Sequence, residues 1–539
     1  MKNVTGDNRI TLKHWQRWTQ QGCSALPFVL ETKLPEEAPG LPASWADAWE
    51  QAAAHSFVLE NGKDGRYTYL GLEPVSVLKG KGDQAEISAL PAGSTEHTTG
   101  APLEIIKRWM EPFKAPSSQD LTAVLAGLPP FLGGCVGFIG YDVVRFLESL
   151  PDSAADDPDI PDYLWMRMNE VWIYDHAECK LICAVYCQVD DPDSAELELR
   201  YSAAWDQAQS MLEQWRQFTS RMQAERAEER FVRQKYMAEA QSRHDEGQWP
   251  GMRSAFSQSA FEQAVSRIQA YIRQGDVFQV NLSLRQEREL QSEPERIYEW
   301  LRILNPSPYM GLLRSPGFSL VSASPELLVK RQGDLISARP IAGTRRRGHT
   351  PEEDEAMAGE LLGSEKERAE HVMLVDLERN DIGKVAAYGT VKVPELMTIE
   401  HYSHVMHLVS QVEGRLAEEK GAFDVIAALF PGGTITGAPK VRTMEIIEEL
   451  EPVRRGPYTG SMGWIDYNGN LELNIIIRTL VVKDGTGMIQ TGAGVVIDSE
   501  PYREYRECHN KAKAIVKAVL LSEEEAAADM NRHEEEMSV

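Results

Sequence analysis

The chain of 539 residues carries 56 lysines and arginines against 82 aspartates and glutamates, a formal net charge of −26 that disfavours nucleic acid and anionic membranes as partners. No apolar run approaches the roughly 18 residues of a membrane-spanning helix, and the N-terminus has no apolar segment of the kind found in signal peptides. The six cysteines form no C-x-x-C pair, so we predict a cytoplasmic chain with reduced thiols.

The first 200 residues are expected to be rich in strands. Short apolar runs such as EVWIYD and KLICAVYCQVD are separated by glycine and proline, which is the pattern of strands and tight turns. The composition changes at residues 194–245, which lack both glycine and proline and abound in Ala, Glu, Arg and Gln. This composition predicts a helical, largely solvated stretch that ends near GQWPGMRS.

From residue 256 onward, helices and strands interleave. Phe261, Val265 and Ile268 recur at helical spacing, and Gly275 is a suitable helix end. The strand VFQVNLSLRQ follows, and further strand–turn–strand units appear later. Long helices among antiparallel-looking strands predict an α+β fold with large sheets flanked by helices, and we place a domain boundary near residue 250.

Two glycine-bearing turns have the composition of anion sites. RPIAGTRRRG, from residue 339, gathers four arginines around Gly343 and Thr344, whose backbone N–H groups and hydroxyl can cradle a carboxylate. FPGGTITGAPK contains Thr434 and leads into a helix, whose N-terminus favours an anion. An ordinary basic turn and a plain loop-to-helix cap are the alternatives.

Two E-x-x-E pairs are candidate metal ligands. Glu367 and Glu370 form one pair, and Glu504 and Glu507 form the other. At a spacing of three, the members of each pair share one face of a helix. Four carboxylates from two helices can hold a hard cation such as Mg²⁺, although an acidic chain also contains such pairs by chance.

Three histidines in HYSHVMHLVS resemble a metal-binding tract. They are His401, His404 and His407, and the segment is predicted to be a strand. Residues three apart in a strand lie on alternate faces, so the three rings cannot converge on one metal. We therefore keep one histidine only as a possible acid or base.

At this point the motifs resemble a known family. GDVFQVNLS, SPELLV, RPIAGT, EKERAEHVMLVDLERND, FPGGTITGAPK and TGAGVVIDS together resemble the chorismate-utilising enzymes, densely from about residue 256 to residue 518. The family fold is two large, packed, antiparallel-rich β-sheets surrounded by helices, with the site in a cleft. The resemblance implies an N-terminal anthranilate-synthase-like domain (1–200), a charged helical connection (201–250), a chorismate-binding catalytic domain (251–522) and an acidic tail (523–539).

The matching motifs also imply roles for single residues. Those expected to bind Mg²⁺ are Glu370 and Glu507 directly, with Glu367 and Glu504 acting through water. Those expected to bind chorismate are Gly343, Thr344, Tyr458, Arg478, Gly492, Ala493, Gly494 and Lys511. Those expected near the reacting ring are His407, Glu326, Thr434 and Gln279. Arg345, Arg346 and Arg347 are expected to steer substrate or pack rather than contact it.

The resemblance also indicates the nucleophile. Relatives that add water carry a lysine base at the position of Gln279, and a glutamine cannot deprotonate water at neutral pH. This favours amination of chorismate by ammonia. Because the chain has no glutaminase signature, the ammonia is expected from a separate glutamine amidotransferase subunit.

The product is the open point. Ala342 replaces a lysine found in many aminodeoxychorismate-forming relatives, and alanine here is typical of the anthranilate-forming ones. FQVNLS, PGGTITGAPK and LELNIIIRT instead resemble the aminodeoxychorismate-forming branch, and we expect Asn281, Gly433 and Asn474 to surround the ring. We therefore predict 4-amino-4-deoxychorismate, on the p-aminobenzoate and folate branch, with anthranilate plus pyruvate as the alternative.

Two further expectations concern regulation. Asn61 stands where tryptophan-regulated relatives carry a serine, so tryptophan feedback is not expected. A non-catalytic regulatory homologue is the remaining hypothesis. It is disfavoured because such a protein would have no physical reason to keep Lys511, Arg478, His407 and the carboxylates together.

Overall fold

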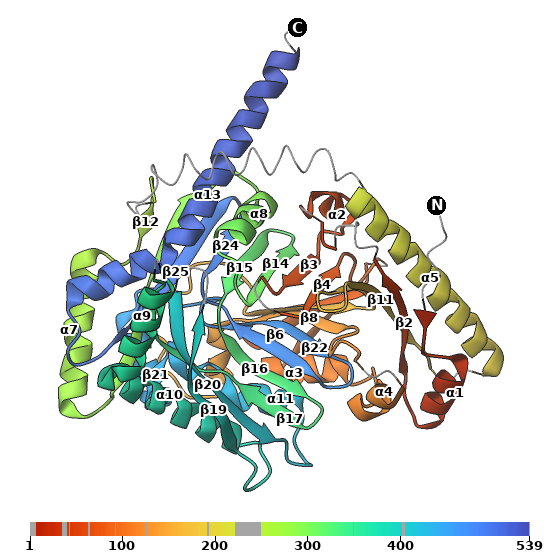
Figure 1. Cartoon of the computed structure of the whole chain (residues 1–539), viewed down its shortest axis with the longest axis horizontal. Helices are drawn as coiled ribbons and strands as arrows, with labels where there is room; N and C mark the ends of the chain where they lie inside the picture. Colours follow the sequence, from red (N-terminus) through yellow and green to blue (C-terminus); the bar gives the residue numbers. More distant parts are fainter. Residues whose placement is uncertain are drawn as a thin grey trace.

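The computed structural model describes residues 7–34, 40–42, 44–62, 65–91, 93–124, 127–190, 193–220, 249–348, 350–401 and 405–537. Within these residues, thirteen strands form one antiparallel sheet and twelve form a second. Figure 1 shows the sheets at the centre of the molecule with helices around them. No helix in the described part of the chain is long and apolar enough to cross a membrane.

The first sheet joins strands from both halves of the chain. From edge to edge it contains β1 (Asp7–Asn8), β2 (Ala25–Lys33), β11 (Lys180–Gln188), β10 (Glu170–Asp175), β4 (Tyr67–Gly71), β3 (Ser56–Glu60), β14 (Tyr309–Ser315), β15 (Phe318–Ser324), β24 (Thr479–Lys483), β25 (Thr486–Val495), β13 (Gln279–Glu289) and β12 (Arg253–Ser254), with β21 (Gly437–Ala438) paired to β13.

The second sheet is built in the same way. Its order is β18 (Ile341–Arg346), β20 (Val405–Arg415), β17 (Leu335–Ala338), β16 (Leu327–Gln332), β23 (Leu471–Ile475), β22 (Ser461–Asp466), β8 (Gly134–Ile139), β9 (Tyr163–Met168), β5 (Ser76–Lys81), β6 (Gln84–Ala89) and β7 (Thr95–Thr99), with β19 (Lys392–His401) paired to β20. Both sheets therefore contain strands from either side of residue 250, and residues 1–200 form no sheet of their own.

Helices surround the sheets. They are α1 (Leu12–Gln20), α2 (Ala46–Gln51), α3 (Pro102–Met110), α4 (Ser118–Val124), α5 (Ser194–Ser220), α7 (Gln258–Gln274), α8 (Pro294–Leu304), α9 (Pro351–Gly363), α10 (Glu365–Gly383), α11 (Ala422–Leu429), α12 (Lys440–Leu450) and α13 (Pro501–Met537), with the short 3₁₀ helices η1 (Tyr141–Phe146) and η2 (Gly433–Ile435). In Figure 1, α5 lies beside β2 and β11, whereas α7, α9 and α10 lie at the opposite side.

The predicted helices form where the sequence indicated. Ser257 caps α7 by accepting a hydrogen bond from the Ala260 N–H, and Gly275 ends it with a φ of 82°. The helical stretch predicted from residue 194 is seen as α5, and its remainder over 221–248 lies outside the described residues. The predicted acidic tail begins inside α13, which projects beyond the body of the molecule in Figure 1.

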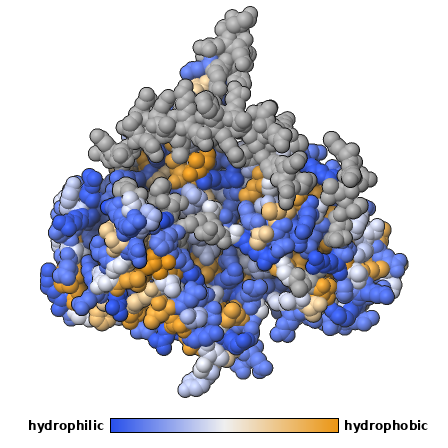
Figure 2. Space-filling model, viewed as in Figure 1, coloured by the Kyte–Doolittle hydropathy of each residue, from blue (hydrophilic) through white to orange (hydrophobic). Residues whose placement is uncertain are grey.

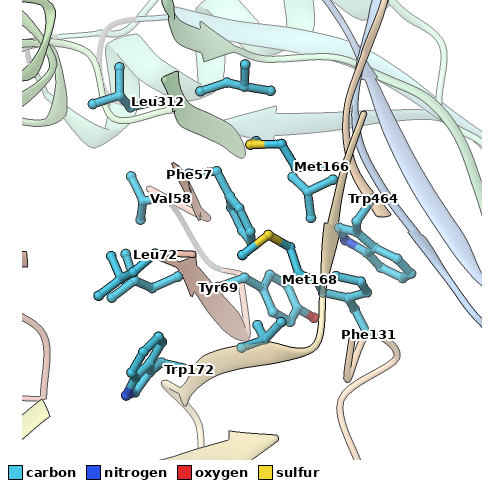
Figure 3. Packing of buried hydrophobic residues seen from close by; sticks show 14 of the residues in the cluster. Phe57, Val58, Tyr69, Leu72, Phe131, Met166, Met168, Trp172, Leu312 and Trp464 are labelled. Carbon is cyan, nitrogen blue, oxygen red and sulfur yellow. The ribbon is translucent and has the colours of Figure 1, made fainter. Parts of the chain in front are cut away.

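The core between the two sheets is aromatic and sulfur-rich. Figure 3 shows Tyr69 from the first sheet facing Met168 and Trp464 from the second. Phe131 links them, because its ring stacks on Trp464 at 5.0 Å and meets Tyr69 edge-on at 5.5 Å. The outer surface is different, since Figure 2 shows a mainly hydrophilic face with scattered apolar residues.

All six cysteines lie in the described residues as free thiols, and Cys135, Cys183 and Cys508 are buried.

Candidate active site

One cavity of about 760 Å³ collects the predicted site residues. We call it the catalytic cavity. Of the residues predicted from the sequence, those that line it are Gln279, Glu326, Gly343, Thr344, Glu367, Glu370, His407, Thr434, Tyr458, Arg478, Gly492, Gly494, Glu504, Glu507 and Lys511. They come from both sheets, from α10 and α13, and from the loops between them. Segments far apart in the sequence therefore meet at one place.

Ala493 is the predicted residue that does not line the cavity. It lies on β25 between Gly492 and Gly494, and successive residues of a strand point to opposite faces. Its side chain is fully buried in a hydrophobic cluster with Val280 and Leu282. The predicted role of Ala493 in substrate binding would therefore involve its backbone and not its side chain.

The carboxylates of the two E-x-x-E pairs face the cavity from α10 and α13. Glu370 Oε1 accepts a hydrogen bond of 2.9 Å from Gln279 Nε2. Glu507 forms an ion pair of 2.8 Å with Lys511 one turn further along α13. Oxygen donors on two facing helices fit Mg²⁺, which keeps several waters and needs one or two protein carboxylates. Among the described residues, no three His, Cys, Asp or Glu side chains form a ready-made metal cage.

Two cationic side chains, Arg478 and Lys511, also line the cavity. Burial lowers the pKa of the Arg478 guanidinium, whereas Tyr458 and the Glu507 carboxylate favour its charged form, and no carboxylate of the described residues lies within ion-pair distance of it. Arg478 also has a φ of 52°, an uncommon conformation for a residue with a side chain. Lys511 Nζ donates to the Gly492 carbonyl at 2.8 Å. A bound carboxylate would offset the free-energy cost of burying the charged Arg478 guanidinium. This part of the cavity is therefore suited to an anion.

Glu326 has the properties of a general acid. It is 7% exposed, and burial raises the pKa of its carboxyl to about 7, although the Thr434 hydroxyl and Lys511 favour the charged form. At and below neutral pH this group can donate a proton into the cavity. A second buried carboxyl, Glu378 on α10, has its pKa raised to about 8 by burial and by its carboxylate neighbours Asp381 and Glu326, and Lys440 opposes the shift.

His407 is held at the rim by the bulge in β18. Gly343, with a φ of 63°, lies where the β18–β20 register shifts between Ala342 and Thr344. His407 Nδ1 lies 3.2 Å from the Gly343 carbonyl, which can only accept, so Nδ1 carries the proton. The Thr344 hydroxyl lies 3.1 Å from the same nitrogen. This contact fixes the ring orientation beside the cavity.

Of the other two histidines of the tract, only His401 lies in the described part of the chain, and it does not line the catalytic cavity. His401 ends β19 and lies 3.9 Å from Asp354, and His404 lies outside the described residues. The predicted strand itself begins as β20 only at Val405. With His404 outside the described residues, the rejection of a three-histidine metal site stays a prediction.

The arginines of RPIAGTRRRG pair with neighbouring carboxylates. Arg345 contacts Glu360 at 3.0 Å and Glu367 at 3.3 Å, and Arg347 contacts Asp354 at 2.6 Å. Arg346 pairs with Glu353 and Arg339 with Glu395 and Glu400. The cluster consequently secures α9 and α10 against β18, so the packing role expected for the outer arginines is the one observed.

Polar groups of the cavity that the motifs did not single out include Gln490, Asn510 and Lys366. Of the three residues expected around the ring, only Asn281 lines the cavity, and its amide oxygen is buried without a hydrogen-bond partner. Asn474 instead lines a second cavity, and Gly433 packs against Leu377. Of the three residues expected to favour 4-amino-4-deoxychorismate, Asn281 alone therefore remains as a residue of the catalytic cavity.

Comparisons with known proteins agree with this geometry. The model of the chorismate binding enzyme family matches residues 55–517. Aminodeoxychorismate synthase component 1 of Bacillus subtilis (strain 168) is 44% identical over 476 residues, which cover 88% of this chain and 94% of that protein. Anthranilate synthase component 1 of Acetivibrio thermocellus is 41% identical over 503 residues, which cover 92% of this chain and 95% of that protein.

The solved structures include a close match in fold. The crystal structure of anthranilate synthase component I from Streptococcus pneumoniae TIGR4 has a TM-score of 0.67 and 32% identity, and the match covers 84% of this chain and 92% of that one. The two-sheet α+β fold expected from the resemblance is thus confirmed. This chain belongs to the chorismate binding enzymes.

Proposed function

We propose that this enzyme aminates chorismate at C4, giving 4-amino-4-deoxychorismate and water, with ammonia from a glutamine amidotransferase subunit in the cytoplasm. The observation that carries the proposal is the wall of β13. The resemblance implies that Gln279 stands where water-adding relatives carry a lysine, and its amide donates to Glu370. Asn281, two residues further along the strand, has a buried amide oxygen without a hydrogen-bond partner in the described structure. The similarity to the Bacillus subtilis aminodeoxychorismate synthase component 1 over 88% of the chain supports the same choice.

The walls divide the work of binding. Chorismate is a dicarboxylate, so Arg478, Lys511 and the backbone N–H groups of the Gly492–Gly494 strand would balance one carboxylate. Glu370 and Glu507 would hold Mg²⁺, with Glu367 and Glu504 beside them, and when bound the ion would neutralise the other carboxylate. Holding the ring at both ends places C4 near the acid and the nucleophile.

The remaining residues handle protons. Glu326, whose pKa of about 7 keeps part of it protonated at neutral pH, would donate its proton to the C4 hydroxyl as that group leaves as water. The ammonia nitrogen forms the new bond to the ring and afterwards loses one proton, which the Glu326 carboxylate can accept. Atoms balance, because one ammonia enters and one water leaves. His407, fixed by Gly343, borders the same space.

Anthranilate formation remains the second candidate because a specific observation favours it. Ala342 lines the catalytic cavity at the position where many aminodeoxychorismate-forming relatives carry a lysine. The Acetivibrio thermocellus and Streptococcus pneumoniae proteins of similar sequence or fold are anthranilate synthase components. This route needs a second step, elimination of pyruvate from a 2-amino intermediate.

Product identification separates the two. Purified protein, chorismate, ammonium and Mg²⁺ should give a product that keeps its enolpyruvyl group, read by mass spectrometry, with pyruvate released only after a lyase is added. Anthranilate fluorescence with stoichiometric pyruvate and no lyase would establish the alternative. Glutamine in place of ammonium should give no turnover by the isolated chain, and turnover with glutamine alone would contradict the need for a partner subunit.

A further inference from the structure

A buried ion pair lies directly behind the catalytic cavity. Arg455 follows α12 and pairs with Glu451 through two hydrogen bonds, Nε to Oε2 at 2.9 Å and Nη2 to Oε1 at 2.7 Å. The Arg455 side chain is 1% exposed and that of Glu451 is 2% exposed. Neither residue lines the cavity, and no motif in the sequence singled out the pair.

The remaining donors of Arg455 reach three separate parts of the cavity wall. Nη2 donates to the Asn281 carbonyl at 2.7 Å, and Nη1 donates to the Ile435 carbonyl at 2.9 Å and to the Thr459 hydroxyl at 3.2 Å. Asn281 and Ile435 themselves line the cavity, and Thr459 follows Tyr458, which also lines it. One guanidinium therefore links β13, η2 and the 458–459 turn.

The carboxylate extends the network to a fourth segment. Glu451 Oε1 accepts from the backbone N–H and the hydroxyl of Ser283, both at 2.8 Å. The same hydroxyl accepts from Gln490 Nε2 at 2.9 Å, and Gln490 lines the cavity from β25. The pair consequently connects neighbouring strands of the first sheet as well as the loops.

Tyr458 is also held by this arrangement. The Arg455 guanidinium lies 5.5 Å from the centre of its ring. Thr459, next in the chain, has a φ of 60°, a rare conformation for a β-branched residue, and its hydroxyl donates to the Tyr458 carbonyl at 2.6 Å. Such a strained conformation persists only where several surrounding contacts hold it. The hydrogen bond from Arg455 to the Thr459 hydroxyl is one of these contacts.

We propose that Arg455, held by Glu451, is a positioning residue for the reaction and sets the cavity wall at Asn281, Ile435 and Tyr458. The inference rests on the proposed function only because its test measures the reaction of chorismate. A purely structural pair would stabilise the fold without affecting catalysis. However, a buried ion pair often contributes little more to stability than apolar residues of similar size would. The placement of its spare donors on cavity segments indicates the positioning role.

The Arg455→Lys variant separates the two roles. Lysine keeps the charge opposite Glu451, but a single ammonium cannot reproduce the planar fork that spans three acceptors. We expect kcat/KM for chorismate to fall about 10- to 100-fold, the scale of an ångström-sized misplacement. The melting temperature should fall by less than about 5 °C.

Arg288→Lys is the matched control. Arg288 lies on the same strand as Asn281, is largely buried and pairs with Glu523 of α13, away from the cavity. Its kcat/KM should stay within about twofold of wild type. If Arg455→Lys also keeps wild-type kcat/KM, or loses activity only in proportion to unfolded protein measured by circular dichroism, the proposal is wrong.

A double-mutant cycle with Tyr458→Phe gives the readout that a structural role would not change. If Arg455 acts through Tyr458, the losses in kcat/KM are not additive, and additive losses would overturn the inference.

Thr459→Val and Thr459→Ser cover the case in which Arg455→Lys does not fold. Valine removes the Thr459 hydroxyl and should lower kcat/KM about tenfold. Serine keeps the hydroxyl and should keep kcat/KM near the wild-type value, because only the lost contact with Arg455 affects the position of the cavity wall. Equal effects would contradict the proposal.

The two proposals fail in different ways. If wild-type protein consumes no chorismate with ammonium, the proposed function is wrong. The positioning inference is then read from chorismate affinity by calorimetry in the same variants. Weaker binding by Arg455→Lys but not by Arg288→Lys supports it, and equal affinities overturn it.

Discussion

The two large cavities of this molecule differ in how their charges are used. The catalytic cavity, about 760 Å³, leaves Arg478 without a close ion pair among the described residues and gathers carboxylates on α10 and α13. A second cavity of about 910 Å³ is bordered by segments from both halves of the chain, among them 59–61 and 468–474. The larger cavity is therefore not the one with the unpaired reactive groups.

Charges in the second cavity are already matched inside the protein. Lys330 pairs with Glu472 at 2.7 Å, and Arg66 pairs with Asp175 at 2.9 Å. Glu60 pairs with Arg302 at 2.8 Å, and Asp334 pairs with Arg415. A charge that is satisfied by the protein has little to gain from a ligand, whereas a buried cation without a partner favours an anion strongly. Volume alone does not distinguish the two cavities, but charge pairing does.

Removing the proposed acid should produce the largest effect. Glu326→Gln keeps the size and polarity of the side chain but cannot deliver a proton, so kcat/KM should fall about 10²- to 10⁴-fold. In the wild type the rate should decline as the pH rises through about 7, since the acid is then deprotonated. A variant with more than a tenth of wild-type kcat/KM, or an unchanged pH profile, would exclude Glu326 as the acid.

The same substitution should change how stability depends on pH. The folded pKa of Glu326, about 7, exceeds the ordinary value of 4.5, so the folded state binds more protons between these two values. This group's contribution to stability is therefore present below about pH 4.5 and is lost as the pH rises to about 7. Glu326→Gln should have a smaller drop in melting temperature over this range. Glu378 does not cancel fully in the comparison, because Glu326 is one of the groups that raise its pKa.

Weakening the metal site should give an intermediate effect. Glu507→Gln removes one carboxylate charge, so the Mg²⁺ concentration for half-maximal rate should rise about 10- to 100-fold. Chelation should abolish the activity of wild type. Glu472→Gln, in the second cavity, is the control and should keep the wild-type Mg²⁺ dependence. If Glu507→Gln matches wild type at limiting Mg²⁺, the assignment of this carboxylate fails.

A carboxylate of the second cavity should matter for stability rather than rate. Glu60→Gln leaves Arg302 with Glu299 as its remaining carboxylate and weakens the bond from the Tyr298 hydroxyl. The free energy of unfolding should fall by about 1–3 kcal/mol, measured by denaturant titration, while kcat/KM stays within about threefold. A large loss of rate with unchanged stability would break the proposed division between the cavities.

The smallest effect expected is no effect at all. Asn61 lines the second cavity at the position where tryptophan-regulated relatives carry serine. Tryptophan up to millimolar concentration should leave the initial rate unchanged. Inhibition that is competitive with chorismate and lost on changes to the second cavity would show that the two cavities communicate.

Local sequence determined much of this structure. The spacing of Phe261, Val265 and Ile268 and the stop at Gly275 define α7, since both depend on interactions within a few residues. The E-x-x-E spacing places each carboxylate pair on one face of its helix for the same reason. The alternation of a strand likewise predicts that the Ala493 side chain points away from the face of its flanking glycines.

Tertiary structure alone decided the rest. Asn474 faces the second cavity because β23 pairs not only with its sequence neighbour β22 but also with β16, which is far away in the sequence. Burial under those strands and helices raises the pKa of Glu326, and no spacing in SPELLV reveals it. Arg455 reaches acceptors at Asn281 and Ile435, as far as 174 residues away in the chain. Short-range rules specify elements, but cavities and their electrostatics arise where distant elements meet, because packing and exclusion of water act through space.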